Sequence, residues 1–522
     1  MLDWLADVLV IGGGPAGAWA AVAAAEAGAA VVLVDKGYLG TSGATAPSNT
    51  GTWLVSPERR QAAVEQRQPR TGGLADPRWV ERTLDTAWDK LHCLAGWGYP
   101  FPDDDEGRPY LANLRGPDYM HFMRRRVLSA GVTVLDHHPA LELLGDGEAI
   151  SGAAGIDRQR HQPWRIRAGA VVLATGGCAF GERMLGAAVL TGDGYLMAAE
   201  AGAGLSGMEF SAQYAFTPKP SALNKGLPYR WATFTRHDGA VISTTGRDRH
   251  SAVAEALLEG PVFCQYDRAS PEVRSWLRQG QPNCFLPLDR SGVEPFTERW
   301  PVTLRCEGTV RGVGGIRLLD DDCATGVPGL YAAGDAASRE RVTGAISGGG
   351  GPNSSWAIAS GNWAGRAAAI FAVHNGARIA GRSTKPLGQV GLRSAAIGRE
   401  ALDAQEIVRA VREEMLPLDR NFFREETTLQ RSLERLDACW ADLRRHEAGD
   451  GPAAIKAREA AALTATARWA YRSALARTES RGMHRRRDIP DADPGFACSL
   501  GVSGLDEIRV ARADGRAIAV AP

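Results

Sequence analysis

Residues 6–35 read ADVLVIGGGPAGAWAAVAAAEAGAAVVLVD, and this stretch decides the fold of the first part of the chain. A short apolar run is followed by the glycine motif at 12–17, an alanine-rich helical stretch and a second apolar run that ends in Asp35. Strand, G-x-G-x-x-G, helix, strand and acid in this order are typical of a dinucleotide-binding unit. The sequence therefore predicts a βαβ unit whose helix begins at a bound pyrophosphate.

The glycines of this motif have separate physical tasks. Gly12 permits the tight turn, Gly14 lets the backbone approach the pyrophosphate, and Gly17 lets the helix pack on the strand. Asp35 is placed to accept hydrogen bonds from an adenosine ribose. A glycine turn that binds no nucleotide is the alternative, and the complete strand–helix–strand context argues against it.

Length and composition limit the remaining classes of protein. A chain of 522 residues predicts two or three domains. The 60 acidic and 60 basic side chains balance, which gives no electrostatic case for a nucleic-acid or membrane-surface partner. The first residues lack the basic region of a signal peptide, the apolar runs are too short for a membrane span, and the eight cysteines form no C-x-x-C pair. We therefore expect a reduced, cytoplasmic protein without a metal site.

Two later segments separate FAD from NAD. Residues 168–177 (AGAVVLATGG) and 329–337 (GLYAAGDAA) each predict a strand that closes on small residues. Together with the first motif they resemble the flavoproteins with two dinucleotide-binding domains, in which the late acid contacts the ribitol of the flavin. The resemblance assigns this role to Asp335, whose carboxylate can accept hydrogen bonds from hydroxyl groups, and it predicts FAD as the cofactor.

Three more segments narrow the resemblance to one family. They are 191–209 (TGDGYLMAAEAGAGLSGME), 307–316 (EGTVRGVGGI) and 477–490 (RTESRGMHRRRDIP). From residue 6 to about residue 490 the chain resembles the flavoprotein subunits of succinate dehydrogenase and fumarate reductase, with L-aspartate oxidase and adenylylsulfate reductase as relatives. The resemblance implies an α/β fold: a Rossmann-type FAD-binding domain, an inserted α+β capping domain and a C-terminal helical domain.

The organisation of the chain agrees with this outline. The flavin-binding signals lie in 1–205 and resume in 302–375, and the proline-rich interval 206–301 predicts the capping domain. Apolar residues at three- and four-residue spacing predict helices within 390–522. Asp514-Gly515 stands between two alternating runs and predicts a terminal β-hairpin.

The resemblance also implies a set of cofactor contacts. These predicted FAD-binding residues are Gly12, Gly14, Pro15, Ala16, Gly17, Asp35, Lys36, Thr41, Ser42, Gly43, Ala174, Thr175, Gly176, Asp193, Gly334, Asp335, Gly349, Gly350, Asn353 and Ser354. Gly349 and Gly350 belong to a run of four glycines at 348–351. We expect this loop to lie against the pyrimidine end of the flavin, since ordered motifs on both sides argue against a flexible linker.

The sequence departs from the dicarboxylate-binding members of the family at the substrate site. The first loop, 41–45, has no histidine for covalent attachment, so FAD is predicted to be noncovalent. The family's substrate-facing histidines are absent from 213–218 and 310–315, and Ser347 stands in place of the clamping arginine. Because a carboxylate clamp needs positive bidentate donors, we expect a substrate other than succinate or fumarate.

Other charged residues are candidates for the chemistry. Arg249 and His250, in GRDRHS at 246–251, are predicted to transfer protons, and a solvated turn is the alternative for that segment. Arg311 is predicted to favour an anionic reduced flavin or substrate. Arg236, Tyr214 and Ser347 are the predicted substrate-binding residues; Tyr214 would stack on an aromatic substrate, as Trp231 would. His484 is expected to be structural.

Three functions remain open on the sequence. The first is an FAD-dependent oxidoreductase that acts on a small anionic or aromatic metabolite and exchanges electrons with a ferredoxin-like or other electron-transfer protein. The second is an oxidase reoxidised by oxygen, of the L-aspartate oxidase type. The third is a catalytically silent flavin-binding scaffold, against which the intact flavin motifs argue. The missing clamp and the noncovalent FAD favour the adenylylsulfate reductase branch.

Overall fold

The predicted βαβ unit forms at the start of the chain in the computed structural model, which describes residues 2–47, 49–104, 106–246, 248–379, 384–393, 403–445 and 449–516. Strand β1 (Leu2–Ile11) leads through the glycine turn into helix α1 (Pro15–Glu26) and then into β2 (Val31–Val34). β1 pairs in parallel with β2 on one side and with β8 (Pro163–Leu173) on the other. The inner residues of β1 are wholly buried, as expected for a central strand of a covered parallel sheet.

One eight-stranded sheet organises the first domain. Its strand order is β16-β6-β7-β8-β1-β2-β5, and β15 (Leu330–Ala332) pairs with β8 in parallel. Ile11 and Ala332 are both in register with Leu173, so three strands end at the same edge. The other strands of this sheet are β5 (Thr133–Leu135), β6 (Ala140–Gly145), β7 (Ile150–Ile156) and β16 (Lys385–Pro386).

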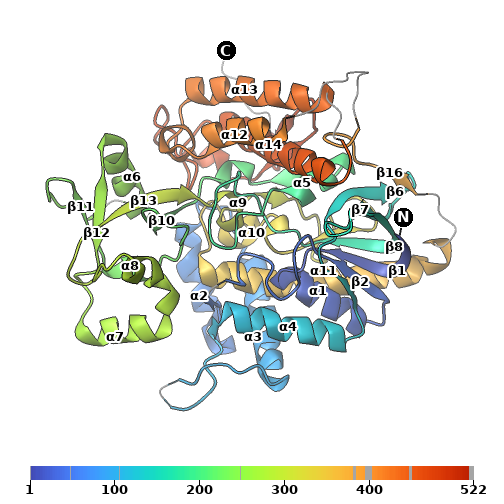
Figure 1. Cartoon of the computed structure of the whole chain (residues 1–522), viewed down its shortest axis with the longest axis horizontal. Helices are drawn as coiled ribbons and strands as arrows, with labels where there is room; N and C mark the ends of the chain where they lie inside the picture. The colour runs from blue at the N-terminus through green and yellow to red at the C-terminus, as the bar shows by residue number, and fades with distance from the viewer. Residues whose placement is uncertain are drawn as a thin grey trace.

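Helices cover this sheet (Figure 1). The long helix α11 (Gly350–Ile379) packs along α1, because glycine and alanine on both helices allow close approach; a Cβ at Gly365 would lie 2.2 Å from the carbonyl oxygen of Ala20. The remaining helices and short strands of the domain are α2 (Arg60–Arg67), α3 (Pro77–Gly96), α4 (Gly116–Ser129), α5 (Asp193–Glu200), α9 (Gly308–Arg311), α10 (Glu340–Thr343), β3 (Thr50–Gly51), β4 (Asn113–Leu114), β9 (Leu205–Ser206) and β14 (Gly315–Ile316).

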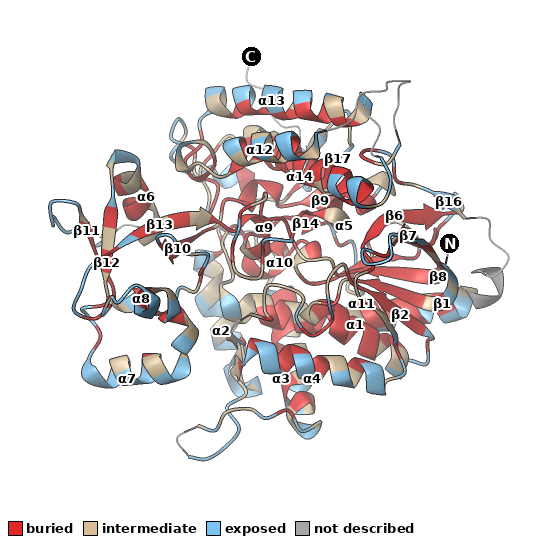
Figure 2. Ribbon diagram, viewed as in Figure 1, coloured by how far each residue is buried: buried red, intermediate tan, exposed pale blue. Residues whose placement is uncertain are grey.

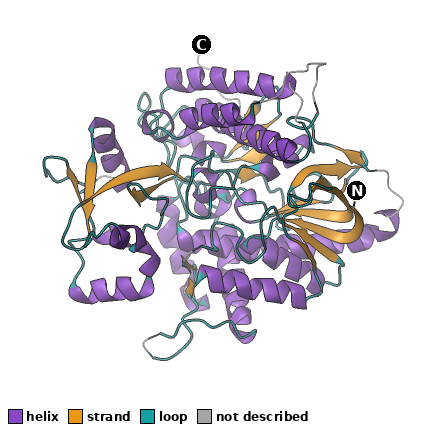
Figure 3. Ribbon diagram, in the orientation of Figure 1, coloured by secondary structure: helices purple, strands orange, loops and turns teal. Residues whose placement is uncertain are grey.

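The inserted cap is a separate antiparallel sheet with helices, at the left of Figure 3. Its strand order is β10-β13-β12-β11, and the chain enters it through β10 (Tyr214–Pro218) and leaves through β13 (Trp300–Cys306). β13 crosses the boundary predicted at residue 301, because it continues to pair with β10 as far as Cys306. The other elements are β11 (Thr233–Arg236), β12 (Val262–Gln265), α6 (Arg249–Glu259), α7 (Pro271–Gly280) and α8 (Leu286–Arg290).

The C-terminal part is helical, as predicted. It consists of α12 (Ala404–Met415), α13 (Glu426–Arg445) and α14 (Pro452–Ala476). Figure 2 shows α13 with an exposed outer face, whereas α14 is mostly buried because it packs on α5 and on the other two helices. Buried ion pairs fix α14 to the first domain: Arg458 Nη1 lies 2.8 Å from an oxygen of Glu200, and Arg477 Nε lies 2.8 Å from Glu209.

A hairpin follows the helices, at a position different from the predicted one. β17 (Leu500–Ser503) pairs with β18 (Arg509–Arg512), so the turn lies between residues 503 and 509. The second run of the hairpin predicted around Asp514-Gly515 (residues 517–520) lies outside the described residues. β17 also pairs with β9 of the first domain, with Val502 opposite Leu205.

Candidate active site

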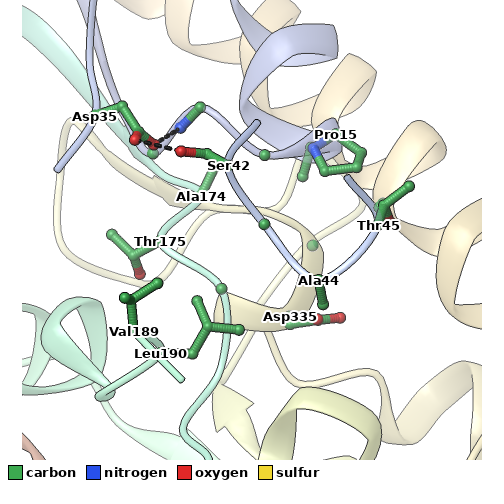
Figure 4. Close-up of a pocket in the computed structure, with 18 of the residues that line it drawn as sticks. Pro15, Asp35, Ser42, Ala44, Thr45, Ala174, Thr175, Val189, Leu190 and Asp335 are labelled. Carbon is green, nitrogen blue, oxygen red and sulfur yellow. Dashed lines mark hydrogen bonds between the residues drawn. The ribbon is translucent and has the colours of Figure 1, made fainter. Parts of the chain in front are cut away.

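A deep cavity opens at the edge where β1, β8 and β15 end, and we call it the main cavity (Figure 4). It contains about 1310 Å3 of space between atoms, including its open mouth. This is the edge at which parallel sheets bind ligands. Eighteen of the twenty predicted FAD-binding residues line the main cavity, and the two exceptions are Gly17 and Thr41.

The glycine turn is built by close backbone contacts. Gly12 has φ +111°, and a Cβ there would lie 2.3 Å from the carbonyl oxygen of Ala174. A Cβ at Gly17 would lie 1.8 Å from the carbonyl oxygen of Gly12. Gly17 therefore lets helix α1 pack closely on the turn, as its place in the motif predicts. It does not line the cavity. Thr41 is exposed, and its hydroxyl donates to the carbonyl oxygen of Tyr38.

At other glycines no side chain stands between the backbone and the main cavity. A Cβ at Gly14 would meet only Gly43, at 3.9 Å, and one at Gly349 would meet nothing within 4 Å. Two buried polar atoms on residues that line the cavity, Thr175 Oγ1 and Asn353 Oδ1, have no hydrogen-bond partner. Because buried polar atoms are normally satisfied, these features fit a polar ligand that lies against the backbone.

Asp35 organises the side of the main cavity that is predicted to hold the adenosine ribose. Its carboxylate accepts hydrogen bonds from the backbone N–H of Gly13 at 2.5 Å, from that of Gly37 at 2.6 Å and from the Ser42 hydroxyl at 2.5 Å. A carboxylate has about four acceptor positions, so at most one remains for a ribose hydroxyl. Asp35 thus holds the glycine turn and the 37–43 loop together as well as lining the cavity.

Lys36 joins the main cavity to the C-terminal domain. Its Nζ donates to Asp193 at 2.8 Å, to the Thr191 hydroxyl at 3.0 Å and to Glu459 of α14 at 3.3 Å. Although burial lowers the pKa of Lys36, the two carboxylates outweigh burial and raise it. The ammonium group is therefore a fixed positive charge in the cavity wall.

Asp335 lines the main cavity beyond the end of β15. Nη1 of Arg339 donates to Asp335 Oδ1 at 2.5 Å, and burial raises the pKa of this carboxyl while Arg339 opposes the rise. The same guanidinium donates to the carbonyl oxygens of Thr309 and Val310. Arg339 was not among the residues selected from the sequence, because its role depends on contacts with a loop about thirty positions away.

Arg311 also lines the main cavity, and it is held by a buried acid. Its Nε lies 3.2 Å from Glu307 Oε1, and Glu307 is 2% exposed. Burial raises the pKa of Glu307, whereas Arg311 and Lys225 lower it. The same oxygen of Glu307 accepts a hydrogen bond from Nδ2 of Asn224 at 2.8 Å. Glu307 therefore connects the cavity wall with the segment that carries Lys225.

A second cavity lies between the cap and the first domain, and we call it the Lys225 cleft. Its walls come from Asn49, the 113–115 segment, Lys225 and the end of α7 with the following turn, 279–284. Asn49 of this cleft is followed in the chain by Thr50, which lines the main cavity. Lys225 of the cleft interacts electrostatically with Arg311, which also lines the main cavity. The two cavities are thus neighbours at two separate points.

A third cavity, the Ser347 pocket, brings together three of the predicted site residues. Tyr214, His250 and Ser347 line it with Asp248 and Arg485. Burial lowers the pKa of His250 to about 4, so the ring is neutral at pH 7, and it stacks on Phe216. Arg485 donates to Asp248 at 3.3 Å and lies over the ring of Phe422. Arg485 thus brings a positive charge to this pocket from the 477–490 segment.

Two of the predicted site residues lie away from these cavities. Arg249 lines none of these cavities, because its Nη1 donates to the carbonyl oxygen of Tyr229 inside the cap. Arg236 pairs with Glu259 on the cap surface and does not reach a cavity described above. Tyr214 lines the Ser347 pocket while its hydroxyl donates to the carbonyl oxygen of Leu416 at 3.0 Å, so its role in substrate binding stays a prediction for the ring alone. Arg247, in the same segment as Arg249, lies outside the described residues.

Family comparisons agree with the fold. The FAD binding domain model matches residues 7–220, and the model of the fumarate reductase flavoprotein C-terminal region matches residues 413–503. The L-aspartate oxidase of Mycobacterium tuberculosis is 29% identical, with 96% of each chain covered. The fumarate reductase flavoprotein of the same organism is 27% identical, with 93% of this chain and 92% of that protein covered.

The chain carries the FAD binding domain and the C-terminal region of the fumarate reductase flavoproteins. Its fold matches that of E. coli quinol fumarate reductase, with a TM-score of 0.81 at 21% identity over 100% of this chain and 98% of the other. It also matches the adenylylsulfate reductase of Archaeoglobus fulgidus, with a TM-score of 0.79 at 20% identity over 100% and 97%. The flavoprotein is an FAD-dependent oxidoreductase, and the residues of the main cavity fit FAD.

Neither a membrane span nor a metal centre is evident in the described part of the flavoprotein. Within the described ranges, none of the helices has both the length and the apolar character that a membrane span requires. In the same part of the chain, no three His, Cys, Asp or Glu side chains are placed to hold a metal ion.

Proposed function

We propose that the flavoprotein is a dehydrogenase or reductase of a small anionic or aromatic metabolite, with noncovalent FAD and a separate electron-carrier protein. The observation that carries this proposal is the position of Arg311, which lines the main cavity while Glu307 fixes its guanidinium. A cation at this position favours substrates or products with negative charge. When bound, FAD supplies the two-electron redox centre, and the protein supplies orientation, charge and exclusion of water.

FAD would be held by the residues of the main cavity. The helix start at Pro15 and the bare backbone at Gly14 suit the pyrophosphate, and Asp35 suits the adenosine ribose. Asp335 suits the ribitol hydroxyls, and the 349–354 segment suits the flavin ring. Ala44 and Thr45 line the cavity in the first loop, and neither offers the imidazole that a covalent bond to FAD would use.

A substrate other than succinate or fumarate is supported by the charges around the Ser347 pocket. Its cation, Arg485, is close to Asp248, so the pair is nearly neutral. His250 adds no charge at pH 7, and Ser347 offers only a hydroxyl. A clamp for two carboxylates needs bidentate positive donors on both sides, and the described residues of this pocket do not provide them. A single anionic group, or an aromatic ring against Phe422, suits the pocket better.

An oxidase is the second candidate, and the 29% identity to L-aspartate oxidase favours it. Such an enzyme needs no partner protein, because oxygen reoxidises the cofactor. The two candidates therefore differ in the fate of the reduced flavin.

Anaerobic photoreduction distinguishes them. The purified protein should show flavin absorbance that acid precipitation releases into the supernatant, as noncovalent FAD requires. After photoreduction, oxygen is admitted and the visible absorbance is followed. Slow reoxidation supports the dehydrogenase or reductase, and rapid reoxidation with stoichiometric peroxide supports the oxidase. Flavin that stays with the precipitate would contradict noncovalent attachment. A panel of carboxylates and aromatic acids, including L-aspartate and succinate, is then tested for bleaching of the flavin.

A further inference from the structure

Lys225 is an unusual amine in this protein. The chain has only six lysines, and the described environment of Lys225 offers its Nζ no hydrogen bond or ion pair. Lys36 makes the contrast clear, since its Nζ has three acceptors. Lys225 is half-buried, and it lies in the wall of the cleft between the cap and the first domain.

A chain of side-chain contacts links the segment of Lys225 to the wall of the main cavity. The chain neighbour of Lys225, Asn224, donates to Glu307, and Glu307 holds Arg311 in the wall of the main cavity. Asn224 is 4% exposed, and its Oδ1 has no partner. A buried acceptor without a donor costs free energy, so a donor from a bound molecule or water is expected there.

We propose that Lys225 exchanges a proton with the substrate, as the acid–base residue of the reaction assigned above, on which this inference rests. In the oxidative direction, bound FAD would supply the two-electron acceptor for the hydride of one substrate C–H bond. The neighbouring O–H, N–H or C–H bond gives its proton to the free amine of Lys225. The new double bond of the product forms from the electron pair left behind, and the ammonium later loses its proton to solvent. The reverse sequence serves reduction.

The charges that face Lys225 support this assignment. Burial, and after it the charge of Arg311 of α9, lower the pKa of Lys225 to about 7, although Glu307 and the Cys284 thiol before α8 act in the opposite direction. Arg115 is the other charged residue that lines the cleft. An amine with a pKa near 7 exists in both protonation states at neutral pH, as general acid–base catalysis requires. A fixed anchor for an anion would instead be fully charged, as an arginine is.

The small number of lysines makes a direct measurement feasible. The FAD-loaded full chain is reductively methylated with 13C-formaldehyde, and the dimethylamine resonances are followed by NMR between pH 5.5 and 10.5. We expect one lysine resonance with a midpoint near 7, about 3 units below the ordinary lysine pKa. That resonance should be absent from Lys225→Arg and present in Lys219→Arg, since Lys219 is exposed. Midpoints above about 9 for all six lysines would overturn the proposal.

If Lys225→Arg does not fold, the resonance is assigned in the wild type by replacing the other five lysines one at a time. The second readout uses the substrate that bleaches the flavin in the panel above. A proton-transfer role predicts that Lys225→Arg and Lys225→Met both slow flavin reduction at least about 100-fold, in line with the size of acid–base effects, and abolish the pH dependence near 7. If Lys225→Arg reduced the flavin at the wild-type rate, a fixed positive charge would be sufficient, and the proton-transfer role of Lys225 would be refuted.

The proton-transfer role of Lys225 and the proposed oxidoreductase function can fail independently. FAD binding with an ordinary pKa for Lys225 would reject the proton-transfer residue and leave the proposed oxidoreductase intact. Loss of FAD from the wild-type protein would reject the proposed function, while the lysine titration could still be measured.

Discussion

Asp335 and Arg339 form a contact of 2.5 Å between Oδ1 and Nη1, and the Arg339 side chain is only 1% exposed. The guanidinium also holds the carbonyl oxygens of Thr309 and Val310, in the helix that ends with Arg311. One buried cation therefore fixes both the predicted ribitol ligand and the loop that carries the predicted catalytic arginine.

Asp335→Asn tests the importance of this carboxylate for the cofactor. The substitution keeps the shape and removes the negative charge, so a charge-assisted hydrogen bond to a ribitol hydroxyl is weakened. We expect the dissociation constant for FAD to rise about 10- to 100-fold, in line with about 1.5–3 kcal/mol for such a bond. Titration of the apoprotein with FAD, followed by flavin fluorescence, measures the change. Asp3→Asn, near the start of β1 and at the opposite end of the strand from the cavity, is the matched control. Equal affinity for FAD in the wild type and both variants would contradict the role of Asp335.

Gly14→Val tests whether the cofactor lies against bare backbone. Gly14 has φ −73°, which valine adopts without strain, and its Cβ position faces the main cavity. We expect a folded protein that retains no FAD, seen as normal far-ultraviolet circular dichroism without visible absorbance. Gly96→Val at the end of α3 also enters open space, away from the main cavity, and should keep FAD. Retention of FAD by Gly14→Val would show that the pyrophosphate lies elsewhere.

Glu340→Gln tests a buried pair of carboxyl groups. Burial, together with the charge of the neighbouring Glu209, raises the pKa of Glu340 to about 8. A raised carboxyl pKa favours the folded protein below about pH 4.5, and this contribution is lost as the pH rises toward 8. The variant should therefore gain stability relative to the wild type as pH rises, by about 2–4 kcal/mol at pH 8.5. Urea unfolding at pH 5 and pH 8.5 measures this difference, and an equal offset at both values would refute it.

His250→Gln tests a side chain whose pKa is lowered in the folded protein, whereas that of Glu340 is raised. The pKa of His250 falls to about 4 through burial, against about 6.5 in the unfolded chain. The neutral ring therefore stabilises the fold above pH 6.5, and this contribution is lost as the pH falls toward 4. With the ring side chain 30% exposed, solvent reduces the effect to about 1–2 kcal/mol. The unfolding free energy of the wild type should fall more steeply than that of His250→Gln between pH 7 and pH 4.5. Parallel curves would show that His250 does not titrate abnormally.

The local motifs were predictable from the sequence because each residue acts with near neighbours. Gly12 and Gly17 meet across one turn, and Asp35 binds Gly37 and Ser42 in the loop that follows it. The approach of β15 to β8 was predictable from two strand patterns that end in small residues. These features need only the local spacing and the rule that ligands bind at the carboxyl edge of a parallel sheet.

The charged residues of the three cavities were harder to predict because their partners are remote in sequence. Asp248 and Arg485 meet across 237 positions, and Asn224 and Glu307 across 83. Arg249 and His250 are adjacent in the sequence, yet helix α6 directs them differently: one binds a cap carbonyl and the other lines the Ser347 pocket. A charged segment therefore predicts that cations are present, but not which of them reaches a cavity.

The pairing of β17 with β9 has a consequence for the order of synthesis. Val502 lies opposite Leu205, so the small sheet beside α5 is incomplete on a ribosome that has not yet made residue 502. Lys36 likewise lacks Glu459 until α14 has been made. The amino-terminal unit can form early, since domains fold as they are made. We therefore expect the cofactor to be loaded only after α14 has been made, and nascent chains truncated before α14 to capture FAD poorly.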